Sequence, residues 1–149
     1  MSRPVFFLLF FSFLITLFGC NKATVEYLST PAYKKLDLPF SEAVRVNNTL
    51  YLSGQIGNVP GQMKLVEGGI EEETRQTLEN IKSTLQRYGA DMDDVVKCTI
   101  FLADMAEWPR MNEVYKTFFN AHYPARSAVA GSGLALDARV EIECIAVLK

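Results

Sequence analysis

A chain of 149 residues is long enough for one domain with a buried core. Hydrophobic residues make up 49% of it and charged residues 21%, a balance that excludes a largely disordered protein. The formal net charge of −2, with no run of Lys or Arg, argues against nucleic-acid binding through a basic patch.

The N-terminus has the pattern of an export signal. An apolar run over residues 5–18 follows one Arg and is shorter than the roughly 20 residues that a membrane-spanning helix needs. Leu17, Gly19 and Cys20 resemble the bacterial lipoprotein box, in which the Cys is lipidated and becomes the new N-terminus. We therefore predict a signal peptide over 1–19 and a lipid-anchored protein of the cell envelope that faces the periplasm. An uncleaved anchor and a soluble exported form are the alternatives.

The mature chain is expected to start with a short polar tether over residues 20–27, followed by a single domain over 28–149. Two short apolar segments, 43–46 and 49–52, flank a pair of asparagines. Asn tolerates a positive φ, so these segments predict a β-hairpin.

The hydrophobic period changes to three or four residues from Ile70 and predicts an amphipathic helix that ends at Gly89. A β-branched run over 95–102 predicts a buried central strand. A second helix is expected next, with Pro109 tolerated in its first turn and Pro124 beyond its end.

The last two strands are expected over 126–130 and 140–148. The order β-β-α-β-α-β-β predicts an α+β fold, in which two helices cover one face of a mixed sheet. No further helix is expected to cover the opposite face. We therefore expect the protein to self-associate through that face.

Two cysteines, Cys98 and Cys144, each lie in an apolar strand-like segment. The two cysteines could form a disulfide in an oxidising compartment or remain separate buried thiols. The absence of a spacing motif favours two buried thiols. Neither has a nearby His or a Cys-x-x-Cys partner, so the sequence predicts no zinc site and no thiol catalysis.

Arg126 is a long cationic side chain in an otherwise apolar strand. Ala128 and Ala130 share its face and leave space beside the guanidinium. A partly buried guanidinium keeps its charge and needs an anionic partner, either from the chain or bound. Glu141 and Glu143 share one face of the last strand. A structural ion pair with either, or a bound carboxylate, would provide that partner.

Several segments resemble the RidA/YjgF family of small enamine/imine deaminases. In chain order they are SGQIG, GGIEEETRQTLENIKSTL, VVKCTIFLADM, PARSAV and VEIECIAV, and the resemblance covers about residues 25–149. It implies a chorismate-mutase-like α+β fold, assembled as a homotrimer with three clefts between subunits.

The resemblance also implies roles for individual residues. In the family, the Arg of the P-A-R-S motif holds the substrate's carboxylate, and here it is Arg126. The first Glu of the terminal motif positions or activates water, and here it is Glu141. The segment LPFSEAV places Phe40 where a Tyr is common in the family. Phe40, Ser53 and Ala128 are expected to contact the substrate together with Arg126.

The implied reaction is hydrolysis of a 2-imino acid, or its enamine tautomer, to a 2-keto acid and ammonia, without a cofactor or a metal. The alternative is a trimeric module that binds small carboxylates or keto acids without turnover. A surface-exposed holdase is a third possibility. Some family members have been linked to RNA cleavage, but the acidic charge of this chain does not favour nucleic acid as a partner.

Overall fold

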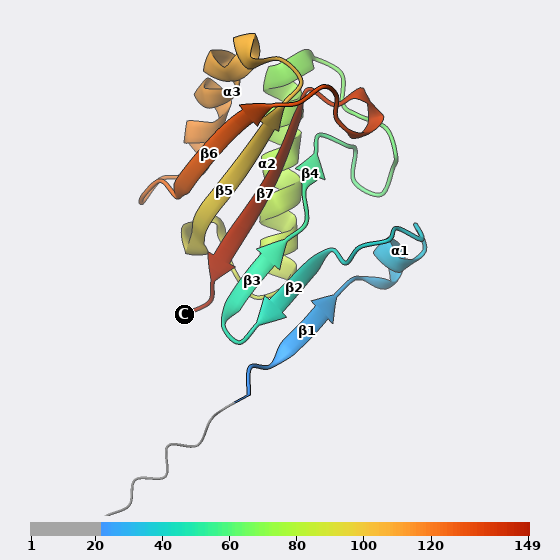
Figure 1. Ribbon diagram of the computed structural model, residues 1–149, viewed down its shortest axis with the longest axis vertical. Helices are drawn as coiled ribbons and strands as arrows, with labels where there is room; N and C mark the ends of the chain where they lie inside the picture. Colours follow the sequence, from blue (N-terminus) through green and yellow to red (C-terminus); the bar gives the residue numbers. More distant parts are fainter. Residues whose placement is uncertain (1–21) are drawn as a thin grey trace, which may run out of the picture.

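The computed structural model describes residues 22–149, so the predicted signal peptide and the lipidation site at Cys20 lie outside the described residues. Its centre is one seven-stranded mixed sheet in the order β1-β2-β3-β7-β5-β6, with the two-residue strand β4 also paired to β7 (Figure 1). Only β5 and β6 pair in parallel among these strands. The strands are β1 (Val25–Leu28), β2 (Ala43–Val46), β3 (Thr49–Leu52), β4 (Gln55–Ile56), β5 (Val95–Leu102), β6 (Ala125–Ala130) and β7 (Val140–Val147).

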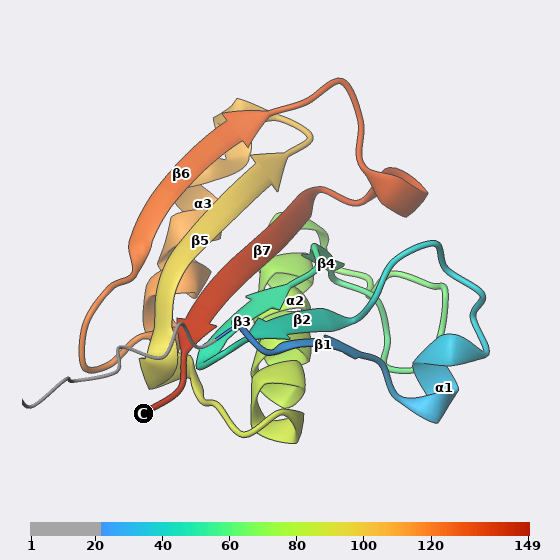
Figure 2. The same cartoon turned by 60° about the horizontal axis from the view of Figure 1, so that its bottom comes forward.

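Two helices, α2 (Gly69–Arg87) and α3 (Trp108–Tyr115), pack on one face of this sheet. The other face is uncovered along β5, β6 and β7 (Figure 2). The predicted α+β architecture is therefore confirmed. A third helix, α1 (Pro31–Lys34), lies beyond the end of β1 and is too short to have shown a hydrophobic period in the sequence.

The predicted hairpin and helices are confirmed with small shifts at their ends. Strands β2 and β3 pair antiparallel, and Asn47 in the turn has φ of 54°. In α2 the residues Ile70, Leu78, Ile81 and Leu85 are fully buried. Pro109 is in the first turn of α3, where its missing N–H leaves no helical hydrogen bond unmade.

The tether predicted over residues 20–27 is wrong at its end, because Val25–Leu28 forms strand β1 at the edge of the sheet. Three of its four side chains are exposed, so the sequence carries no apolar alternation. Backbone pairing fixes the strand instead, together with hydrogen bonds that join Thr24 to Asn47 at 2.9 and 3.0 Å.

The two faces of the sheet have different chemistry. Residues of β5 and β7 that point toward the helices are buried, among them Cys98, Ile100, Ile142 and Cys144. Because side chains alternate along a strand, Glu141 and Glu143 point to the uncovered face. No helix within residues 22–149 is both long enough and apolar enough to cross a membrane.

Candidate functional site

Glu141 lies on the uncovered face of β7, directly against Gly54 in the link between β3 and β4. A Cβ at position 54 would lie 2.0 Å from Oε1 of Glu141, far inside the closest approach of real atoms. The backbone of Glu141 pairs with that of Ile56 on the short strand β4. Glycine at position 54 therefore makes the space that the Glu141 carboxylate occupies.

Ser53 connects this carboxylate to the loop that carries Phe40. The Ser53 hydroxyl donates to the carbonyl of Ser41 at 2.7 Å, and the Ser53 N–H donates to the carbonyl of Glu42 at 3.2 Å. Phe40 precedes Ser41 and is 50% exposed. The structure thus brings Phe40 and Ser53, two of the predicted contact residues, to the same end of the sheet as Glu141.

A buried carboxylate holds that loop in place. Glu42 is 5% exposed and forms an ion pair with Arg87 at the end of α2. Its other oxygen accepts from the hydroxyl of Tyr88 at 2.8 Å and from the N–H of Thr30 at 3.3 Å. Burial, together with the hydrogen bond to Glu42, raises the pKa of Tyr88 to about 12. These bonds fix the segment around Phe40 to the helix layer.

The environment of Glu141 suits it to proton transfer. Burial raises the pKa of its carboxyl above the ordinary value, and the negative charge of Glu143 raises it further. A carboxylate of raised pKa accepts a proton more readily near neutral pH and can return it later in a reaction.

Arg126 lies on the opposite face of the sheet from Glu141. Its backbone partner on β5 is Cys98, whose side chain faces the helices, whereas Glu141 is paired with Phe101. Of the two partners that the sequence left open for Arg126, the structural ion pair with Glu141 or Glu143 is therefore not formed. The register of β7 turns both carboxylates away from the guanidinium. Ala128, the remaining predicted contact residue, shares the helix-facing side with Arg126.

Aromatic rings, rather than an acid, support the Arg126 guanidinium. Its central carbon lies 4.7 Å from the ring centroid of Tyr115 and 5.8 Å from that of Trp108. The ion pairs found within residues 22–149 do not include Arg126. Its charge is thus held in position by two π faces and is not neutralised by a carboxylate of the same protomer.

The sequence analysis did not identify Trp108 and Tyr115 as partners of the guanidinium. Their spacing of seven residues, two helical turns, puts both on one side of α3, and this spacing was the available signal. Tyr115 is buried, but Trp108 is 40% exposed, which core packing alone does not explain.

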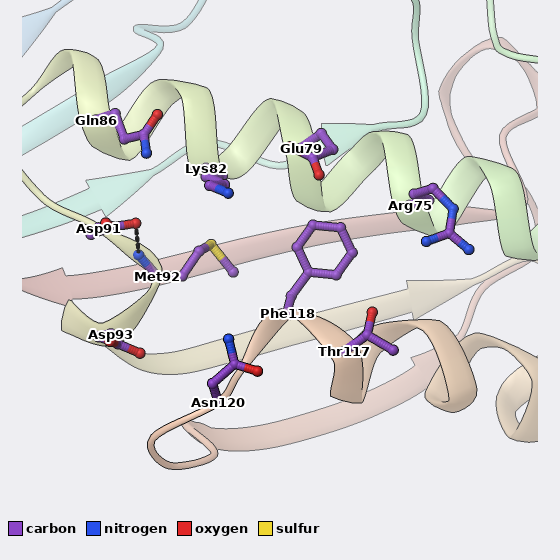
Figure 3. Close-up of a pocket in the computed structure, with 10 residues that line it drawn as sticks. All are labelled: Arg75, Glu79, Lys82, Gln86, Asp91, Met92, Asp93, Thr117, Phe118 and Asn120. Atoms are coloured by element: carbon purple, nitrogen blue, oxygen red, sulfur yellow. Dashed lines mark hydrogen bonds between the residues drawn. The ribbon is translucent and has the colours of Figure 1, made fainter.

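A groove on the protomer lies away from both Arg126 and Glu141. It has a volume of about 470 Å³ and lies between α2 and the segments 91–93 and 117–120 (Figure 3). Its lining mixes the positive Arg75 and Lys82 with the negative Glu79, and neither Arg126 nor Glu141 reaches it. A hollow of about 360 Å³ is lined by residues of the loop that carries Phe40. Neither of these two hollows is lined by Arg126 or Glu141.

The described part of the chain holds no group of three or more His, Cys, Asp or Glu side chains arranged to bind a metal ion.

Comparison with known proteins assigns the chain to a family. The profile of the family described as Endoribonuclease L-PSP matches residues 34–148. The chain belongs to this family, the RidA/YjgF family. The mouse relative, named 2-iminobutanoate/2-iminopropanoate deaminase, is 47% identical over 109 residues, which are 73% of this chain and 81% of the mouse protein. The human protein of the same name is 43% identical over 109 residues, 73% of this chain and 80% of its own length.

Solved structures confirm the RidA/YjgF fold. Yeast Mmf1 superposes with a TM-score of 0.74 at 38% identity and covers 85% of this chain and 100% of its own. The TdcF protein of E. coli, solved with bound serine, has a TM-score of 0.71 at 34% identity and covers 75% of this chain and 90% of its own.

Proposed function

We propose that the protein hydrolyses 2-imino acids, or their enamine tautomers, to 2-keto acids and ammonia. The observation that carries the proposal is the Arg126 guanidinium, which is held over the rings of Tyr115 and Trp108 and forms no ion pair within residues 22–149. Such a cation is free to take the carboxylate of a small substrate. The mouse and human relatives, both named as imine deaminases, support the same reaction.

We propose further that the working unit is a homotrimer whose sites lie between protomers. Arg126 and Glu141 face opposite sides of one sheet, so the two residues of a single site come from neighbouring protomers. The uncovered face supports this assembly because it exposes apolar side chains on several strands, namely Val25, Tyr27, Tyr51 and Val129. Apolar surface of this kind favours association.

In the proposed mechanism, Arg126 binds the substrate's carboxylate with two parallel hydrogen bonds and fixes its plane. Glu141 of the neighbouring protomer accepts a proton from a water molecule as its oxygen attacks the C=N carbon. The attack produces a tetrahedral carbinolamine. Glu141 then returns the proton to the nitrogen. It next carries the hydroxyl proton of the carbinolamine to the same nitrogen, the C–N bond breaks, and ammonia leaves as the C=O bond of the keto acid forms. Few other contacts are available to so small a ligand, so we expect binding weaker than about micromolar.

The test is release of keto acid from an imino acid generated in situ, with wild type, Arg126→Lys and Glu141→Gln compared. An ammonium cannot replace the paired bonds of a guanidinium, so Arg126→Lys is expected to lose about 10- to 100-fold in kcat/KM. Arg75→Lys is the matched control, since Arg75 is exposed and pairs with Glu72. Full turnover by Arg126→Lys would refute the assignment.

A binding module without turnover is the second candidate function. Phe40 brings no hydroxyl to the site, and a relative of the same fold was solved with a bound amino acid. This candidate predicts that wild type, Arg126→Lys and Glu141→Gln all match the uncatalysed rate, while wild type still binds a 2-keto acid and Arg126→Lys binds it more weakly.

We also propose that the protein is lipidated at Cys20 and held at the periplasmic side of the cell envelope. The apolar run over 5–18, with Leu17 near its end and Gly19 and Cys20 directly after it, supports this proposal. Metabolic labelling with a fatty acid is expected to mark the wild type and not Cys20→Ser. Equal labelling of both proteins would refute it.

A further inference from the structure

Two cysteines oppose each other across the centre of the sheet. Cys98 on β5 and Cys144 on β7 are direct backbone partners, and their Sγ atoms lie 2.6 Å apart. Both side chains face the helix layer and are almost completely buried, at 0% and 1% exposure. Both are free thiols in the structure.

The backbone at this pair already meets the requirements of a disulfide. Directly opposed residues of antiparallel strands have Cα atoms about 4.5–5.5 Å apart, which lies within the roughly 4.4–6.8 Å found across disulfides. Because opposed residues point to the same face, the two Cβ atoms also point the same way. Formation of the bond therefore needs no movement of either strand.

We propose that Cys98 and Cys144 form an intramolecular disulfide that joins β5 to β7, made by thiol–disulfide exchange with an external disulfide such as oxidised glutathione. This proposal depends only on the protomer. It holds or fails independently of the proposed deaminase activity.

The exchange proceeds in two steps. The Cys98 thiolate attacks one sulfur of the external disulfide, forms a mixed disulfide and releases the first external thiolate. The Cys144 thiolate then attacks Sγ of Cys98, which closes the protein bond and releases the second external thiolate. Two protein thiols are oxidised and one external disulfide is reduced, and the two protons from the cysteines end on the released thiols.

In the folded protein the surroundings favour the thiolate at Cys98 over the thiolate at Cys144. The hydrogen bond with Cys144 lowers the pKa of Cys98, and the nearby Tyr115 hydroxyl and the charge of Arg126 lower it further against the opposing effect of burial. The same hydrogen bond and burial raise the pKa of Cys144. The Tyr115 hydroxyl makes no ordinary hydrogen bond in the described chain, but it lies close enough to Cys98 to act on its charge.

Burial determines when the bond forms and how well it lasts. External disulfides reach Cys98 and Cys144 while the chain folds, before the helix layer covers β5 and β7. After folding, the same burial excludes reductants. The disulfide is therefore expected to persist when the folded protein is placed in reduced glutathione. It is expected to be reduced when urea is added to the same buffer.

The experiment refolds the full chain from urea in oxidising and in reducing glutathione buffer, then labels free thiols with N-ethylmaleimide in denaturant. From the oxidised sample we expect neither Cys98 nor Cys144 to be labelled, and trypsin to yield peptides 98–110 and 140–149 as one cross-linked species. The cross-link closes a long loop, so the thermal midpoint is expected to rise by about 5–15 °C relative to the reduced sample.

Two variants complete the test. Cys20→Ser retains both opposed cysteines and is expected to behave as the wild type in label, cross-link and midpoint. Cys144→Ala is expected to have the same midpoint in both buffers. The proposal is overturned if Cys98 and Cys144 of the oxidised wild type are both labelled or carry only glutathione. Loss of the cross-link in Cys20→Ser would also overturn it, as would equal thermal midpoints of the wild type in the two buffers.

Discussion

Arg126 on β6 and Glu141 on β7 lie on opposite faces of one β-sheet, although both strands are direct neighbours of β5. The backbone of Arg126 pairs with that of the buried Cys98, whose side chain faces the helices. The backbone of Glu141 pairs with that of Phe101, the strand position that points to the uncovered face. Two groups separated by a sheet cannot act on one small molecule. If both act in the same reaction, they come from different protomers.

Mixed oligomers test this relationship directly. In a closed ring of three, a site uses Arg126 of one protomer and Glu141 of the next. A ring that contains both Arg126→Ala and Glu141→Gln protomers then has one site with both native residues. Random mixing of the two inactive proteins in equal amounts should restore about a quarter of the wild-type activity. The measurement is keto-acid release after the two proteins are co-refolded.

Two controls define that result. Each variant refolded alone should stay inactive. When a variant that carries both Arg126→Ala and Glu141→Gln is co-refolded with wild type, the activity should not exceed that of wild type diluted by the same factor. Failure of the co-refolded mixture to gain activity, with mixed oligomers verified by mass spectrometry, would contradict a site shared between protomers.

The acid limb of the pH profile should report Glu141. Burial and the charge of Glu143 raise the pKa of Glu141, and only the ionised carboxylate accepts a proton from water. Activity is therefore expected to fall as the pH drops through this raised pKa. Glu143→Gln removes one cause of the shift and should move the limb to lower pH, as measured by kcat/KM against pH. Glu67→Gln, at a highly exposed carboxylate that pairs with Lys64, should leave the limb in place.

Gly54→Ala should inactivate the protein without unfolding it. The new methyl group would lie 2.0 Å from Oε1 of Glu141 and would force that side chain out of position. Since positioned acid–base groups contribute about 10²- to 10⁴-fold, we expect kcat to fall by at least about 10-fold. Gly133→Ala is the matched control, because a Cβ there meets no atom within 4 Å. Unchanged kcat in Gly54→Ala would show that the Glu141 carboxylate does not need its present position.

Trp108→Leu should weaken substrate binding more than turnover. Its ring supports the Arg126 guanidinium, and such contacts contribute about 0.5–2 kcal/mol, so we expect KM to rise by about 2- to 30-fold with little change in kcat. Trp108→Phe keeps an aromatic face and should retain most of the affinity. Equal KM values for the Leu variant and wild type would mean that Tyr115 alone orients the guanidinium.

The sequence predicted those parts of the fold in which burial repeats with a regular period. The α2 helix and strand β5 were predicted because their apolar residues recur at helical spacing or form a β-branched run. Strand β1 could not be found in this way, because its side chains are mostly exposed and its pairing depends on the backbone of β2.

The sequence named candidate residues for the site but not their geometry. Motifs identified Arg126 and Glu141, and Phe40, Ser53 and Ala128 followed from the same resemblance. The separation of Arg126 from Glu141 depends on the register between β5 and its two neighbours, which no single strand's sequence specifies. The close contact between Gly54 and Glu141 likewise joins segments far apart in the chain.

The early start of β1 limits how far the domain could move from an anchor. Strand β1 begins at Val25, and a fully extended chain advances at most about 3.6 Å per residue. A lipid on Cys20 would thus keep the first strand within about 18 Å of the bilayer surface, roughly five residues of chain. If the proposed lipid is present, the domain would be confined to a thin layer next to the lipid headgroups, and only substrate that reaches this layer would be hydrolysed.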